Sequence, residues 1–155
     1  MRIRLISVGS KMPNWIEEGY EEYSRRLGAD VKLELVEIPL GKRSKGSDVN
    51  RLKEKEADQM LAFVGAGDLV VTMEIMGKAW STEKLAGNMG EWLHSGRNIS
   101  LLVGGPEGLH SSCLAKADLR WSLSPLTLPH PLVRVVVAEQ VYRAWSIIHN
   151  HPYHK

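Results

Sequence analysis

The spacing of apolar positions switches along the chain between every second residue, typical of a strand, and every third or fourth, typical of a helix. Alternation or short apolar runs predict strands over residues 2–8, 31–38, 68–75, 98–103 and 120–124. Helical spacing predicts helices from about Asn14 to Gly28, from Ser47 to Gly65 and, more weakly, over residues 81–94. Elements alternating in this way predict an α/β fold, with an open, mostly parallel sheet flanked by helices on both faces.

The last long helix is apolar most of the way round. We expect it from Leu132 onward, with Pro131 at its first position, where the missing N–H costs nothing. Its apolar residues form two faces, one with Val133, Val137, Val141 and Ile148 and the other with Val135, Ala138, Tyr142 and Trp145. In so short a chain, two such faces predict that one packs on the sheet and the other on a second subunit.

Composition indicates one globular domain spanning residues 1–155. Hydrophobic residues make up 43% of the chain and charged residues 25%, which is ordinary for a folded domain. The first ten residues do not resemble a signal peptide, and no segment approaches the roughly 20 apolar residues of a membrane span, so a cytoplasmic location is expected. The single Cys113 cannot form an internal disulfide, and we expect it to be a small buried hydrophobe.

Charge leaves the kind of partner open. A net charge of +2 permits an acidic partner without requiring one. Positive charge gathers in the segment GKRSKGS, which contains Lys42, Arg43 and Lys45. A solvated loop is the simpler explanation of this segment, and contact with RNA is the alternative.

Three loops that follow predicted strands share an unusual composition. The stretches MEIMG, VGGPEG and LSPLTLP are apolar, with glycine or proline, and almost uncharged. Ligands of open parallel sheets bind at the carboxyl ends of the strands. These loops therefore predict an apolar pocket for a flat heteroaromatic ring held by main-chain groups. The glycine loop matches neither a Walker loop nor the full dinucleotide fingerprint, and taken alone a tight turn explains it equally well.

The sequence does not favour metal or hydrolytic chemistry. His130, His149, His151 and His154 stand near the end of the chain, but no Asp or Glu lies among the tail residues to complete a metal site. Surface or RNA-contacting histidines are the better interpretation. No Ser/His/Asp or Cys/His signature is present in its usual loop context.

Taken together, five stretches resemble one family, the ribosomal large-subunit pseudouridine N3-methyltransferases of the RlmH type, in the SPOUT class of knotted methyltransferases. These stretches are VGSKMPNW, EIPLGKR, LLVGGPEGL, LTLPHPLVR and YRAWSIIHNHPYHK, and the likeness covers essentially the whole chain. The resemblance implies a C-terminal trefoil knot, a homodimer and S-adenosyl-L-methionine as the cofactor. The cofactor residues carried over from the family are Met73, Gly104, Leu123, Ser124, Pro125, Leu126, Thr127 and Leu128.

The implied reaction is methylation of N3 of a pseudouridine in the helix 69 loop of 23S rRNA within the ribosome, with no metal and no membrane. Arg143 is a hypothetical stabiliser of the developing base anion, and His130 a hypothetical proton acceptor. An ion pair of Arg143 with Glu139, and a capping or packing role for His130, are the alternatives.

The expected RNA contacts are Lys42 and Arg43 in the basic loop and Tyr153 and His154 in the tail, and the tail is expected to reach the partner subunit's pocket. Two other functions stay open. One is a SPOUT methyltransferase that acts on tRNA, and the other is a non-catalytic RNA-binding protein associated with the ribosome.

Overall fold

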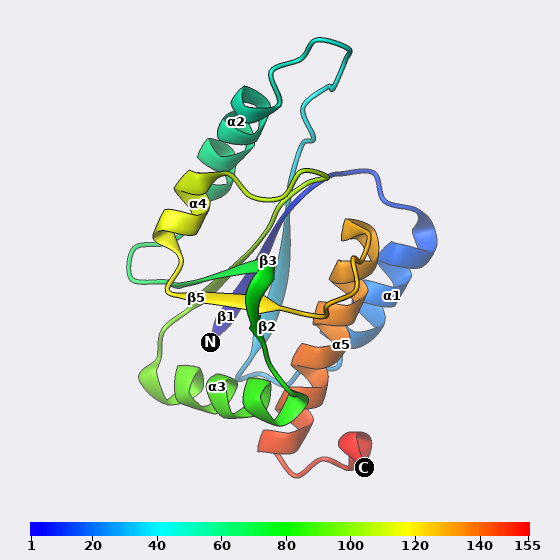
Figure 1. Cartoon of the computed structure of the whole chain (residues 1–155). Helices are drawn as coiled ribbons and strands as arrows, with labels where there is room; N and C mark the ends of the chain where they lie inside the picture. The colour runs from blue at the N-terminus through cyan, green and yellow to red at the C-terminus, as the bar shows by residue number, and fades with distance from the viewer.

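Five strands form one all-parallel sheet with helices on both faces in the computed structural model, which describes residues 1–155 (Figure 1). The elements are β1 (Arg2–Val8), α1 (Asn14–Ser24), β2 (Lys32–Ile38), α2 (Val49–Ala62), β3 (Leu69–Ala79), α3 (Thr82–Ser95), β4 (Ile99–Val103), α4 (Ser111–Lys116), β5 (Leu119–Ser122), α5 (His130–Ile148) and the short 3-10 helix η1 (Pro152–His154). The strand order is β2-β1-β4-β3-β5. The predicted α/β class is confirmed, whereas the knot stays a prediction.

Apolar side chains on the two faces of the sheet build two separate cores. On β1, Ile3 and Leu5 belong to the larger core, which also takes residues from α1, α3 and α5. Ile6 and Val8, whose side chains point the other way, belong to the smaller core with residues of α2 and α4. Cys113 of α4 is fully buried in that smaller core. The sheet is therefore covered on both faces, as parallel sheets usually are.

Two helix starts differ from the prediction. Asp48, not Ser47, is the N-cap of α2, and its carboxylate accepts a hydrogen bond from the backbone N–H of Arg51 at 3.2 Å. The Ser47 hydroxyl accepts instead from the backbone N–H of Ser44 at 2.9 Å. Helix α5 begins at His130, because Pro129 is already its extended N-cap. The six-residue helix α4 was not predicted, since it is too short to show a helical period.

Strand β3 runs beyond its predicted end at residue 75. The register of its pairing with β5 shifts between Met73 and Lys78, and both of these residues pair with Trp121. Gly77 makes this possible, because a Cβ there would lie 2.8 Å from the backbone carbonyl carbon of Arg120. Gly77 therefore lets β3 continue beyond residue 75 and lie against β5 at very short range.

The second apolar face of α5 packs within the chain. A Cβ on Gly19 of α1 would touch Val135 at 3.3 Å, and the Trp145 indole N–H donates to Asp30 at 3.0 Å. Ala138 and Tyr142 are buried in the single chain. Helix α1 therefore covers part of this face, whereas Val135 and Trp145 are only half-buried, so packing of one face of α5 on a second subunit stays a prediction.

Candidate cofactor pocket and active site

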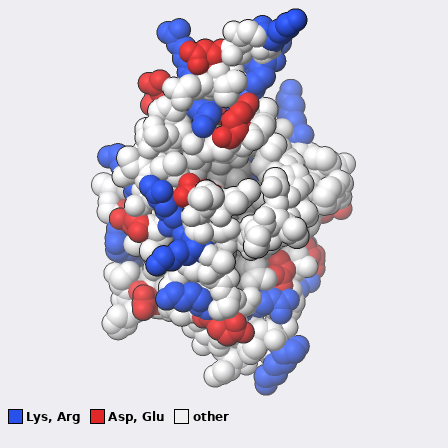
Figure 2. Space-filling model, in the orientation of Figure 1, with Lys and Arg blue, Asp and Glu red and all other residues white.

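A cavity of about 710 Å³ opens where β4 and β5 end, at the carboxyl edge of the sheet. Its walls come from residues 73–75 of β3, from the loop after β4 and from the segment between β5 and α5. The volume lies within the roughly 300–1,000 Å³ that small-molecule sites occupy. The face of the molecule in Figure 2 carries few charged side chains at its centre, while Lys, Arg, Asp and Glu are interspersed around it. This is the edge where the three apolar loops are expected to meet.

The glycine loop forms a tight turn against the pocket. A Cβ on Gly104 would lie 2.5 Å from the backbone carbonyl carbon of Gly108, so no larger residue fits at position 104 without moving backbone. The Gly108 N–H donates to the Gly105 carbonyl at 3.0 Å, and Gly108 itself has a φ of +81°. The glycines of the turn thus bring backbone close to this wall of the cavity.

The proline-containing segment after β5 supplies the facing wall. Ser124 folds it back, since its hydroxyl accepts from the backbone N–H of Leu126 at 3.0 Å. Most of the predicted cofactor residues line this one cavity, namely Met73, Gly104, Leu123, Ser124, Leu126, Thr127 and Leu128. Pro125 is the exception, because it is exposed and does not line the cavity. The structure thus brings together residues that lie more than fifty positions apart in the sequence.

Two buried polar atoms at the pocket lack a hydrogen-bond partner. They are Nε1 of Trp121 and Oε1 of Glu74, and both residues line the cavity. The nearest charge to Glu74 is Arg120, whose Nη1 lies 3.7 Å from that oxygen. An adenosyl group offers both hydroxyl donors and ring acceptors for such atoms within an otherwise apolar cavity. The residues present therefore fit S-adenosylmethionine, and sequence reasoning missed Trp121 because an indole in an apolar strand resembles a core residue.

His130 lies at the pocket end of α5. Its Nε2 would be 3.1 Å from a Cβ on Gly9, so the imidazole packs directly on the loop after β1. Burial, and next the charge of Arg134, lower the pKa of His130 below its usual 6.5. The imidazole is therefore neutral near pH 7 and able to accept a proton. A capping role is not observed, since Pro129 is the cap residue and no side chain caps α5.

Arg134 holds the same loop from inside the protein. Its side chain is only 1% exposed, and it donates to the Gly9 carbonyl and to Glu37, both at 2.7 Å. The only sign in the sequence that Arg134 is buried is its position within the apolar run VRVVV. A buried guanidinium without such partners would be strongly destabilising, so this pairing fixes the position of Gly9 beside His130.

The other predicted catalytic residue, Arg143, and the two predicted RNA contacts of the tail, Tyr153 and His154, lie at the far end of α5. Arg143 Nε donates to Glu139 at 2.8 Å, as the alternative interpretation of Arg143 expects. The Tyr153 hydroxyl donates to the same carboxylate at 2.9 Å, and the Arg143 guanidinium lies 4.9 Å from the centre of the Tyr153 ring. His154 contacts Ser146 through Nδ1 at 3.2 Å. None of these residues lines the cavity.

Distance along the helix separates this cluster from the pocket. An α-helix rises about 1.5 Å per residue, so Arg143 lies roughly 20 Å along α5 from His130. A single chain therefore does not bring the two predicted catalytic residues together.

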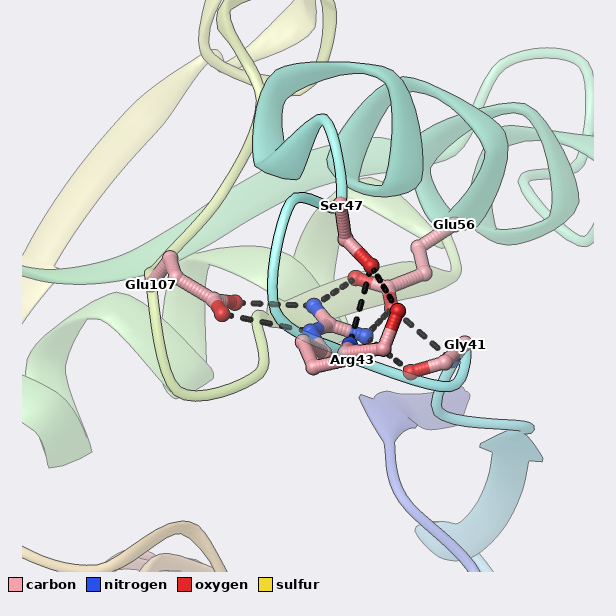
Figure 3. A network of polar contacts seen from close by, with 6 residues as sticks. Gly41, Arg43, Ser47, Glu56 and Glu107 are labelled. Atoms are coloured by element: carbon pink, nitrogen blue, oxygen red, sulfur yellow. Dashed lines mark hydrogen bonds and ion pairs between the residues drawn. The ribbon is translucent and has the colours of Figure 1, made fainter.

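The positive residues of the basic loop between β2 and α2 lie in two different environments. Lys42 and Lys45 are exposed. Arg43 instead lies within a network of acidic side chains, shown in Figure 3, and donates to both Glu56 and Glu107.

No cluster of three or more His, Cys, Asp or Glu side chains that could hold a metal ion is present. No helix has the length and apolar character needed to cross a membrane.

Comparison with known proteins settles the family. A family model described as "Predicted SPOUT methyltransferase" matches residues 1–154. The chain belongs to the SPOUT methyltransferases. Two relatives of this SPOUT methyltransferase are both named "Ribosomal RNA large subunit methyltransferase H". The one from Marinomonas sp. (strain MWYL1) is 56% identical over 155 residues and 100% of both chains. The one from Alkalilimnicola ehrlichii is 59% identical over 155 residues, 100% of this chain and 99% of the relative.

A solved structure shares the fold of this SPOUT methyltransferase. It is that of a probable methylase family protein from Haemophilus influenzae Rd KW20, with a TM-score of 0.56 over 99% of this chain and 70% of the other. At 13% identity the likeness supports the fold alone.

Proposed function

We propose that this SPOUT methyltransferase transfers a methyl group from S-adenosylmethionine to N3 of a pseudouridine in the helix 69 loop of 23S rRNA, as a homodimer in the cytoplasm. The observation that carries the proposal is the single cavity that collects seven of the eight predicted cofactor residues. Full-length relatives named for large-subunit rRNA methylation support the choice of substrate.

Main-chain and apolar groups would hold the cofactor. The turn at 104–108 and the segment 123–128 form its walls, while Glu74 and Trp121 supply polar atoms that have no hydrogen-bond partner in the chain. When bound, S-adenosylmethionine supplies a methyl group already activated on a sulfonium. The residues of the chain therefore have two tasks, which are to place N3 of the base in line with that methyl group and to manage the N3 proton.

His130 and Arg143 divide the second task. His130 lies at the cavity in its neutral form and would accept the N3 proton. Arg143, a permanent cation, would stabilise the negative charge that develops on the base. Tyr153 presents an aromatic ring beside Arg143, which suits stacking on a base. Lys42 in the basic loop would contact phosphate.

A second subunit would complete the site. Because Arg143 and Tyr153 lie roughly 20 Å along α5 from the cavity of their own chain, a partner's cluster must meet this pocket for all groups to act together. The pocket rim also exposes apolar side chains that a partner or substrate would cover, with Ile75 at 54%, Met76 at 89% and Leu126 at 71% exposed. A two-fold dimer repeats that contact twice and gives two sites.

Mass spectrometry of helix 69 tests the proposed substrate. RNA from cells that lack this protein is compared with RNA from the same cells carrying it on a plasmid. We expect one methyl group on the pseudouridine to be lost and then restored. An unchanged methylation pattern contradicts the proposal. Incubation of the purified protein and labelled S-adenosylmethionine with ribosomes or with bulk tRNA identifies the substrate class, and labelling of tRNA alone would replace this function.

A further inference from the structure

We propose that Arg43 is a positioning residue of the cofactor pocket, which clamps the turn 104–108 to the body of the protein through Glu107. This inference rests on the proposed function, since it concerns the same pocket. It also assigns Arg43 a role different from the contact with RNA that its position in the basic loop suggests.

All five N–H groups of the Arg43 guanidinium have partners (Figure 3). Nε and Nη2 donate to the two oxygens of Glu107 at 3.1 and 2.8 Å, a two-bond contact typical of arginine and carboxylate. Nη1 and Nη2 donate to the two oxygens of Glu56 at 2.6 and 3.2 Å, and Nη1 also donates to the Gly41 carbonyl at 2.6 Å. No donor is left for a phosphate oxygen.

The anchor side of the network is rigid. Glu56 lies on α2, is 4% exposed, and also accepts from the Gly41 backbone N–H at 3.2 Å. A buried carboxylate needs a paired cation, so the pairing with Glu56 holds Arg43 on the body of the protein. The side chain of Arg43 is itself only 21% exposed, which limits competition by water.

The held side of the network is a wall of the cavity. Glu107 lines the pocket and lies in the turn closed by the Gly108 to Gly105 hydrogen bond. Its two bonds to Arg43 are the only hydrogen bonds from a side chain of residues 104–108 to another segment. Hydrogen bonds from Arg43 lower the pKa of Glu107, so the pair stays ionised at neutral pH. The clamp therefore sets where the turn lies before a cofactor arrives.

Three variants test the clamp. Glu107→Ala removes the held side and leaves the buried Arg43–Glu56 pair intact. Arg43→Lys keeps a positive charge beside Glu56 but loses the two-bond contact to Glu107, and Arg43 does not line the cavity. The third variant combines both changes. Glu22→Ala is the matched control, since Glu22 of α1 forms surface ion pairs with Arg25 and Arg26, which follow that helix, and none of the three lines the cavity.

Calorimetric titration with S-adenosylmethionine gives the first measurement. Each single change is expected to raise Kd about tenfold, and the double variant is expected to lose no more than either single change, because both remove one contact. If Arg43→Lys binds S-adenosylmethionine with normal affinity, the proposal is overturned. Any effect of Glu107→Ala would then come from direct contact between Glu107 and the cofactor, and not from the clamp. Losses that multiply in the double variant, or an equal loss in Glu22→Ala, also overturn it.

Amide hydrogen exchange of the cofactor-free protein gives a second measurement that does not depend on binding. Residues 104–108 are expected to exchange faster in both single variants, while the sheet keeps its protection and the melting temperature stays close to that of the control. Unchanged exchange at 104–108 contradicts the clamp. If the unaltered protein does not bind S-adenosylmethionine, the proposed function fails, and the exchange result still decides whether Arg43 holds the turn.

Discussion

At its first turn, helix α5 contributes His130 and Val133 to a cavity walled by apolar side chains and backbone. At its other end the same helix carries a charged and aromatic cluster, in which Arg143 and Tyr153 share the carboxylate of Glu139. The first environment suits a nucleoside cofactor, which shape and main-chain groups recognise. The second suits an RNA base, whose negative charge and flat ring call for a cation and an aromatic surface.

The difference between the two ends shows how a chain of 155 residues can hold two kinds of site. The apolar cavity and the charged cluster are two different environments within one chain. Placing the two chemistries at opposite ends of one rigid helix separates them by roughly 20 Å, and symmetric pairing of two chains would bring them together again.

Removal of Pro152–Lys155 is expected to have the largest effect. The deletion removes Tyr153 and His154 from the charged end and leaves the cavity untouched. Methylation of ribosomes should fall by about 100-fold or more, while calorimetry should give a nearly unchanged Kd for S-adenosylmethionine. Retained methylation would show that the tail takes no part in the reaction.

His130→Gln tests the pocket end and should lower kcat roughly 100-fold at pH 7, because a proton acceptor is lost. Since burial and the charge of Arg134 lower the pKa of His130, the acidic limb of the pH–rate profile of the unaltered enzyme should lie at a lower pH than an ordinary histidine would give. The free energy of unfolding should likewise be highest above pH 6.5 and decrease as the pH falls through the lowered pKa, because folding favours the neutral imidazole. A pH–rate profile of His130→Gln that keeps the acidic limb would assign that limb to another group.

Gly104→Ala tests the backbone wall of the cavity. The added Cβ would lie 2.5 Å from the Gly108 carbonyl carbon, so the turn must shift. Affinity for S-adenosylmethionine should fall roughly 30-fold, which corresponds to a loss of about 2 kcal/mol of binding free energy when the turn is displaced. Gly87→Ala on α3, where a Cβ would meet nothing within 4 Å, is the matched control and should bind normally. Equal affinity of the two variants would show that the turn adapts without cost.

Ser81→Ala should have the smallest effect and acts on neither end of α5. The Ser81 hydroxyl caps α3 by accepting from the Lys84 N–H at 3.0 Å. Its loss should cost about 1 kcal/mol of unfolding free energy in a urea titration and leave cofactor affinity unchanged. A change in affinity as large as that of Gly104→Ala would mean that general stability, not local shape, governs binding.

The sequence was informative wherever a pattern repeats over many residues. Strands β1, β2 and β4 and the longer helices follow from apolar spacing, and the loops at the carboxyl edge follow from the rule for parallel sheets. The resemblance then identified which loop residues face one cavity. Pro125 shows the limit of that step, because a motif lists neighbouring residues without saying which of them point inward.

Polar pairs between residues far apart in the chain could not be predicted from the sequence. Arg43 pairs with Glu107, and Arg134 with Glu37, across 64 and 97 positions respectively. No local spacing predicts such contacts, because the sheet order decides which loops become neighbours. The contact of α1 with α5 could not be predicted for a related reason, since hydrophobicity alone does not distinguish a neighbouring helix of the same chain from a partner subunit.

The stacked indoles of Trp80 and Trp121 provide a built-in optical signal for the pocket. Their ring centres lie 4.9 Å apart with an interplanar angle of 15°, and Trp121 lines the cavity with a free N–H. A ligand that enters the cavity changes the surroundings of an emitting ring that is only 3% exposed and so screened from water. Ultraviolet emission can thus follow the filling of the cavity in real time without any attached dye, and Trp121→Phe would remove the signal.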